Sequence, residues 1–160
     1  MLQKFELITA KDKPALLAFS NPEWLETTKG ALTELGYKVH TAATHGDFLI
    51  RFSQIHYQVV ILEELFCANN PGENSTLQAL QNMPASQRRH AIVILVGDSF
   101  QTFTPMQAFQ QSVHTVVNPS EMFLMKQLIE KAVADNDMFL HSFCEVQARL
   151  LSGRARDESH

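Results

Sequence analysis

Four consecutive aliphatic residues at positions 59–62, Val-Val-Ile-Leu, end at two carboxylates, Glu63 and Glu64. A short apolar run rich in β-branched residues predicts a strand that is buried on both faces. Such strands occur in parallel sheets that helices cover on both sides, and the ligands of these sheets bind just beyond the carboxyl ends of the strands. Glu63 therefore stands where a functional site is expected.

Further apolar runs occur at residues 15–19, 91–96 and 115–117, with a weaker run at residues 37–41. The segments between them have helical spacing. This alternation predicts right-handed βαβ units and a parallel sheet with helices on both faces. Residues 5–9 are a candidate for an extra edge strand.

The first predicted helix has clear start and stop signals. Asn21 is a suitable N-cap, Pro22 suits the first helical position, and Gly36 is placed to end the helix in a left-handed conformation. Residues 47–54 form the second predicted helix, with three side chains turned inward, Phe48, Leu49 and Phe52. Three more helices are expected. The third begins after a cap at Ser75, the fourth spans residues 105–112, and the last begins after a cap at Ser120.

Composition excludes several classes of protein. The net charge of −4 and pI of about 5.9 argue against a nucleic-acid binder, which usually carries a basic face. No apolar stretch reaches the ~18 residues that span a bilayer, so we expect a cytoplasmic protein without membrane insertion. Cys67 and Cys144 lie far apart and predict two unpaired thiols. The seven histidines form no metal-binding motif and are expected at the surface or at strand ends, so no metal or cofactor is expected.

The order and spacing of these elements resemble the receiver (CheY-like) domain of bacterial response regulators. The resemblance covers residues 13–134 and rests most on residues 21–43, including the Gly36-Tyr37 step, and on Asn118-Pro119 after the fifth strand. It implies a flavodoxin-like, three-layer α/β sandwich with a five-stranded parallel sheet in the order 2-1-3-4-5. Residues 1–12 would be an N-terminal extension of this domain.

Receivers accept a phosphoryl group on an aspartate at the end of the third strand. An acidic pair after the first strand holds Mg²⁺, and a hydroxyl after the fourth strand and a lysine after the fifth contact the phosphoryl group. By resemblance, these positions fall on Phe19 and Ser20 (acidic pair), Glu63 with Glu64 beside it (acceptor), Val96 followed by Gly97 (hydroxyl), and Asn118 (lysine).

None of the family's functional residue types is present at these positions. Mg²⁺ requires hard oxygen ligands, usually including carboxylates, and phosphoryl transfer needs cationic groups to neutralise the equatorial oxygens. We therefore expect a degenerate site that neither binds Mg²⁺ tightly nor accepts phosphate. Glu63 is either a mimic of the phosphorylated state or a solvated carboxylate left at a strand end. A hydrogen bond from the Asn118 amide to Glu63 would take the place of the missing lysine contact.

The last predicted helix runs about thirty residues without Gly or Pro, longer than a receiver needs. Its apolar stripe has alternating steps of four and three, which is a heptad pattern; it comprises Met125, Ile129, Ala132, Asn136, Phe139, Phe143, Val146 and Leu150. The first three are expected to pack on the sheet. The last four form a predicted interaction surface, either for a second copy or for another partner, unless a turn at residues 135–137 folds residues 135–151 back. Residues 152–160 are expected to be a disordered tail.

These observations predict a non-enzymatic pseudo-receiver in bacterial signal transduction. It would bind protein partners independently of phosphorylation and form a homodimer through the last helix. One alternative is a sensor that binds a small ligand or nucleotide in the crevice at the strand ends. A second alternative is an atypical response regulator that accepts phosphate on Glu63 or Glu64.

Overall fold

The structure, a computed structural model, describes residues 12–88 and 91–158. Five strands form one parallel sheet in the order β2-β1-β3-β4-β5. The strands are β1 (Lys13–Ala18), β2 (Tyr37–Ala42), β3 (Val59–Glu63), β4 (Ile92–Val96) and β5 (Thr115–Val117). The predicted fold class and strand order are confirmed. The candidate strand at residues 5–9 lies outside the described residues.

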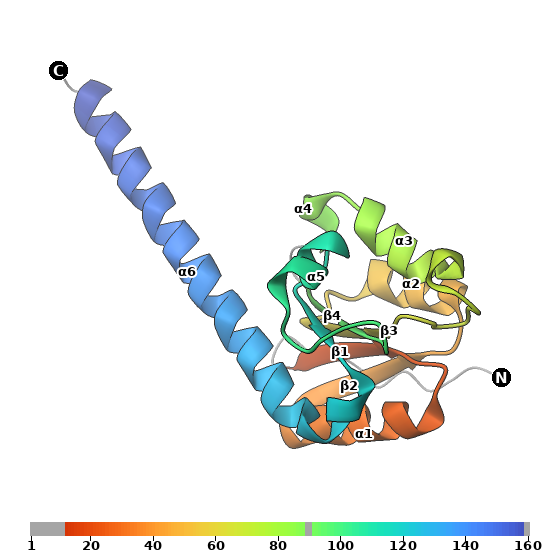
Figure 1. Ribbon diagram of the computed structural model, residues 1–160. Helices are drawn as coiled ribbons and strands as arrows, with labels where there is room; N and C mark the ends of the chain where they lie inside the picture. The colour runs from red at the N-terminus through yellow and green to blue at the C-terminus, as the bar shows by residue number, and fades with distance from the viewer. Residues whose placement is uncertain (1–11, 89–90, 159–160) are drawn as a thin grey trace.

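Helices cover both faces of the sheet, so the molecule has three layers (Figure 1). One face is covered by α1 (Pro22–Glu34) and α6 (Met125–Glu158), and the other by α2 (His45–Gln54), α3 (Ser75–Asn82) and α5 (Pro105–Gln110). Alternate residues of β1 enter the two cores, with Leu16 and Ala18 on the α2 side and Leu17 on the α1 side. This two-sided burial explains why the strand sequences are continuously apolar rather than alternating.

The predicted signals at the ends of α1 are confirmed. The Asn21 side chain accepts hydrogen bonds from the backbone N–H groups of Glu23 and Trp24, and Pro22 occupies the first turn. After the helix, Gly36 has a φ of 85°, a conformation that L side chains rarely adopt. The chain can therefore reverse directly into β2.

The inward face of α2 differs from the prediction. Phe48 and Phe52 are buried, but Leu49 is 37% exposed and Arg51 is buried in its place. Residues 48, 51 and 52 share one helix face, whereas residue 49 lies about 100° away from residue 48. The Arg51 guanidinium is compatible with burial because its Nε lies 3.0 Å from Oδ1 of Asp47.

Two more helical segments are present that the sequence analysis did not predict, the 3-10 turn η1 (Pro71–Glu73) and the short α4 (Ala85–Arg88). The predicted cap of α3 at Ser75 is wrong by one residue. Asn74 caps the helix through a hydrogen bond from the Leu77 N–H to its Oδ1 atom, at 3.1 Å.

The C-terminal region also differs from the prediction. Asn118, and not Ser120, caps a 3-10 helix, η2 (Pro119–Leu124), from which α6 continues. Helix α6 is uninterrupted from Met125 to Glu158, so residues 135–137 form no turn and residues 152–158 are helical rather than disordered. Figure 1 shows the C-terminal half of α6 projecting away from the sheet. The alternative in which this segment folds back is therefore wrong.

Candidate functional site

The sheet brings the predicted site residues to one edge. β1 pairs with β3 up to Ala18 and Leu62, and β3 pairs with β4 up to Glu63 and Val96. The residues that follow these strands therefore meet at their carboxyl ends, where α/β sheets bind ligands. We call this place the crevice. It is lined by Trp24, Glu63, Glu64, Leu65, Val96, Gly97 and Asp98 and has a volume of about 50 Å³.

Glu63 is not the solvated carboxylate of the sequence analysis, because only 7% of the residue is exposed. Its Oε2 atom accepts a hydrogen bond from the Ser20 backbone N–H at 2.6 Å. The Ser20 hydroxyl in turn accepts one from the Cys67 backbone N–H at 2.8 Å. None of the lysine and arginine side chains that the structure describes forms an ion pair with Glu63. A single backbone N–H group, that of Ser20, rather than a cation, therefore holds this carboxylate.

Glu64 is also buried, with 8% of the residue exposed. Its carboxylate accepts the Ser99 hydroxyl, with distances of 3.0 and 2.8 Å to the two oxygens, and its backbone N–H donates to the Val96 carbonyl at 2.8 Å. Gly97 permits this packing, because a Cβ atom there would lie 2.9 Å from the Glu64 Cβ and 3.0 Å from a ring carbon of Phe100. Glycine at position 97 thus allows the Glu64 side chain to lie under the β4–α5 loop.

Asn118 has partners other than Glu63. Its Nδ2 group donates to the backbone carbonyls of Phe100 at 2.8 Å and Asp98 at 3.4 Å, while its Oδ1 accepts the Ser120 N–H. The predicted hydrogen bond from Asn118 to Glu63 is therefore not formed. The reason is local: the short amide side chain caps η2 and holds the β4–α5 loop at the same time.

Hydrogen bonds hold the loop after β3 in place beside the strand ends. Asn74, which is fully buried, donates from Nδ2 to the carbonyls of Glu63 at 3.1 Å and Glu64 at 2.9 Å. Cys67, which has a φ of 49°, contacts the Ala43 carbonyl through Sγ at 3.3 Å, in addition to its bond with Ser20. Residues from three separate loops therefore satisfy one another at this edge of the sheet.

Several residues of this site, among them Asn74, Asp98 and Ser99, were not predicted from the sequence. The only available signal was the position of Asp98 and Ser99 directly after Gly97, behind a buried strand. The donor set does not fit Mg²⁺. Within the described part of the chain, no three or more His, Cys, Asp or Glu side chains are grouped so that they could hold a metal ion. Phe19, at a position where the family has an acidic ligand, is buried in the apolar core.

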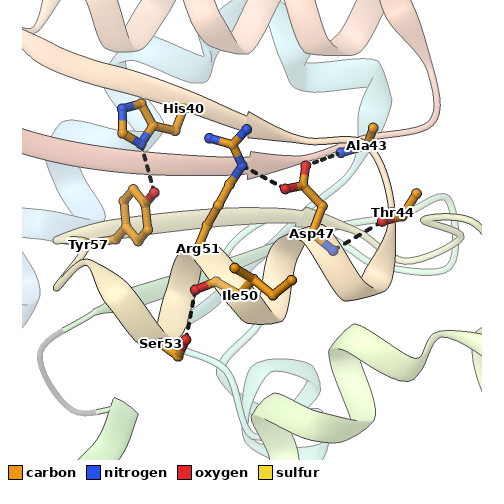
Figure 2. A network of polar contacts seen from close by, with 8 residues as sticks. All are labelled: His40, Ala43, Thr44, Asp47, Ile50, Arg51, Ser53 and Tyr57. Carbon is orange, nitrogen blue, oxygen red and sulfur yellow. Dashed lines mark hydrogen bonds and ion pairs between the residues drawn. The ribbon is translucent and has the colours of Figure 1, made fainter. Parts of the chain in front are cut away.

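A second polar network lies outside the crevice, beside α2 (Figure 2). The ring Nδ1 of His40 lies 2.7 Å from the hydroxyl of Tyr57, and both residues are buried. The expectation that histidines lie at the surface or at strand ends therefore fails for His40, which lies inside β2. Burial raises the pKa of Tyr57 to about 12, an effect that the nearby Arg51 partly opposes.

Helix α6 divides into two parts by burial. Met125, Ile129 and Ala132 are buried, as predicted. Val146 and Leu150 on the projecting part are 53% and 64% exposed. The other two predicted interaction residues, Phe139 and Phe143, lie on the same helix, but their side chains are outside the described set. None of the helices formed by residues 12–88 and 91–158 combines the length and hydropathy needed to cross a bilayer.

Comparison with known proteins identifies the fold of the chain but no sequence family. No family profile matches the sequence, and no curated protein matches it. Among solved structures, the chain is similar to a response regulator receiver domain (CheY-like) from Methanospirillum hungatei, at 16% identity and a TM-score of 0.61, over 80% of this chain and 98% of that one. It is also similar to the chemotaxis response regulator CheY4 of Vibrio cholerae, at 14% identity and a TM-score of 0.57, over 76% and 99% of the two chains.

A third similar structure is NtrX from Brucella abortus in complex with ATP, at 14% identity and a TM-score of 0.61. The match covers 82% of this chain but only 28% of the NtrX chain. At these identities the likeness shows the fold alone. The chain has the fold of response regulator receiver domains.

Proposed function

We propose that this protein is a pseudo-receiver: a non-enzymatic module of bacterial signal transduction that binds protein partners without phosphorylation and self-associates through α6. One observation carries the proposal. The carboxylate at the acceptor position, Glu63, is buried, and its Oε2 atom already accepts a hydrogen bond from the Ser20 N–H. A nucleophilic carboxylate must instead be accessible to a phosphoryl donor.

The surrounding groups support the same reading. Phosphoryl transfer relies on metal ions and cationic side chains to neutralise developing charge. Here the neutral amide of Asn118 replaces the family's lysine, and it binds loop carbonyls. Phe19 supplies no ligand for Mg²⁺, and the Ser20 hydroxyl is an acceptor for Cys67. The polar groups of the crevice are thus engaged in hydrogen bonds within the protein, which leaves few of them free to assist phosphoryl transfer.

The volume of the crevice bears on the sensor alternative. Small-molecule sites usually enclose about 300–1,000 Å³. The crevice holds about 50 Å³, which is room for water molecules but not for a nucleotide. Partner binding through an exposed surface is therefore better supported than ligand binding between the strand ends.

The projecting half of α6 supplies such a surface. Exposed apolar residues that form a stripe mark interaction sites. Val146 and Leu150 continue the heptad pattern of the buried residues, and a heptad pattern is the one that packs against another helix. Self-association through this stripe is consistent with the helix being continuous beyond the sheet.

The proposal is tested by treating the full chain with acetyl phosphate and Mg²⁺ and measuring its intact mass, with an active receiver treated in parallel. We expect no phosphorylated species. A stable adduct of one phosphoryl group on this chain would support the atypical response regulator instead. Thermal shift against nucleotides tests the sensor alternative, and we expect no change in melting temperature.

A further inference from the structure

The exposed apolar stripe of α6 lies on the same face of the helix as the residues that pack against the globular part of the chain, which we call the body. Met125, Ile129 and Ala132 point into the body, and the steps of four and three continue without a break to Asn136, Val146 and Leu150. At 100° per residue these positions stay within one face of a straight helix. Figure 1 shows the body beside only the first part of α6. A second helix on the stripe would therefore lie on the body's side of α6, beyond the body's edge.

This direction restricts how two copies can meet. In a parallel pair the twofold axis runs between the helices, and both stripes face it. Both bodies would then lie towards that axis at the same level and would overlap. In an antiparallel pair the two bodies lie at opposite ends of the helix pair, each beside only the last turns of the partner's helix. We propose that α6 binds α6 of a second copy in antiparallel orientation, an inference that rests on the self-association proposed above.

The heptad positions are compatible with this orientation. Asn136 and Leu150 are a positions, and residues 139 and 146 are d positions, by the spacing of the sequence. Antiparallel coiled coils pair a layers with d layers. Placing position 143 opposite the partner's Val146 puts position 139 opposite the partner's Leu150, and Asn136 opposite the partner's Gly153. An amide thus faces a glycine instead of a large apolar side chain.

Charge favours the same orientation. In a parallel dimer a g position lies near the e position five residues later on the partner, which brings Arg149 towards Arg154. Two such arginine pairs would repel across the dimer. In the antiparallel alignment g positions face each other, and Asp135 falls opposite the partner's Arg156. The charge pattern therefore opposes the parallel pair and supports the antiparallel one.

A groove lies where the antiparallel alignment places the end of the partner's helix. It has a volume of about 470 Å³, lies between α5 and α6, and is lined in part by Pro105, Ala108, Ala132, Asp135 and Asn136. The alignment puts positions 153–157 of the partner beside Ala132 and Asn136. In the proposed dimer the C-terminal end of α6 of the second copy occupies this groove.

Disulfide cross-linking tests the orientation in the full chain, in a background with Cys67→Ser and Cys144→Ser. A disulfide needs Cα atoms within about 7 Å. In the antiparallel pair the two copies of position 150 are separated along the axis by eleven residues, about 16 Å. Leu150→Cys chains alone should therefore not cross-link. A mixture of Phe139→Cys chains and Leu150→Cys chains should form the mixed disulfide, which differs in mass from the two homodimeric disulfides and is identified by mass spectrometry.

A Leu150→Cys homodimer in high yield would overturn the antiparallel orientation and leave self-association standing. A dimer by sedimentation that gives neither cross-link also overturns it, because another surface then holds the dimer. A monomer at tens of micromolar defeats both proposals. Charge reversal is the second measurement: Asp135→Arg and Arg156→Asp should each weaken the dimer several-fold, and the double variant should recover it. The two positions lie about 31 Å apart along one helix, so a parallel dimer predicts no recovery.

Discussion

Replacing Glu63 with alanine is expected to destabilise the fold, because the carboxylate is part of the structure of the crevice. The substitution leaves the Ser20 N–H without its acceptor at 2.6 Å. A hydrogen bond to a charged group contributes about 1.5–3 kcal/mol, and a buried donor left without a partner costs about 1–3 kcal/mol. Both figures describe the loss of the same hydrogen bond and are therefore not added. We therefore expect the free energy of unfolding to fall by about 2 kcal/mol.

Urea denaturation measures this change. With a slope of roughly 2 kcal/mol per M, a loss of that size lowers the midpoint by roughly 1 M. Both chains should carry Leu150→Asp, so that self-association does not add to the apparent stability. Glu63→Gln is the matched control, because it keeps an acceptor oxygen and the side-chain length. It should lose less than Glu63→Ala, since a neutral hydrogen bond contributes about 0.5–1.5 kcal/mol.

The opposite sign would refute the reasoning. If Glu63 were only a leftover of a decayed site, its buried charge would carry a desolvation cost that alanine removes. Glu63→Ala would then be as stable as the unchanged protein or more stable. Such a result would also remove the observation on which the proposed function depends.

Three further outcomes are expected. The Tyr57 pKa is raised from its ordinary value of 10.0 to about 12, so the stability that its protonated form contributes is present below pH 10 and is lost between pH 10 and 12. In thermal unfolding, the difference in melting temperature between pH 9 and pH 11 should therefore be smaller for Tyr57→Phe than for the unchanged protein. Gly97→Ala should cost about 1–3 kcal/mol in chemical denaturation, because the added Cβ would lie 2.9 Å from the Glu64 Cβ, and a change near zero would contradict this packing. Leu150→Asp should convert the dimer to a monomer in sedimentation, whereas Met138→Asp, equally apolar and 71% exposed but on the opposite helix face, should leave the dimer intact.

The features that the sequence predicted correctly depend on local chemistry. The strand runs are apolar on both faces, and the run at residues 115–117 coincides with β5. Asn21, Pro22 and Gly36 mark the ends of α1 through contacts within a few residues. The heptad stripe likewise identified three of the four buried residues in the described part of α6 from spacing alone, because a continuous helix keeps such residues on one face; the fourth, Leu128, lies beside the stripe.

The candidate site was only partly predictable for the opposite reason. The positions of Glu63, Gly97 and Asn118 at one edge follow from the strand order, which the resemblance to receiver domains implied. Their hydrogen bonds do not, because the partners are distant in sequence: Ser20 lies 43 residues from Glu63, and Ser99 lies 35 residues from Glu64. Asn118 was expected to turn towards Glu63 but satisfies nearby loop carbonyls instead.

The sequence by itself determined a parallel sheet with helices on both faces, since residue types and their spacing carry that information, whereas the strand order followed from the resemblance to receiver domains. Only the tertiary structure decided that Glu63 is buried and held by a backbone N–H, that Asn74 donates to the Glu63 carbonyl, and that α6 continues past the sheet without a turn. Those facts arise where separate loops compete for the same donors and acceptors. The geometry of the folded chain, and not any local segment, decides which partner is reached.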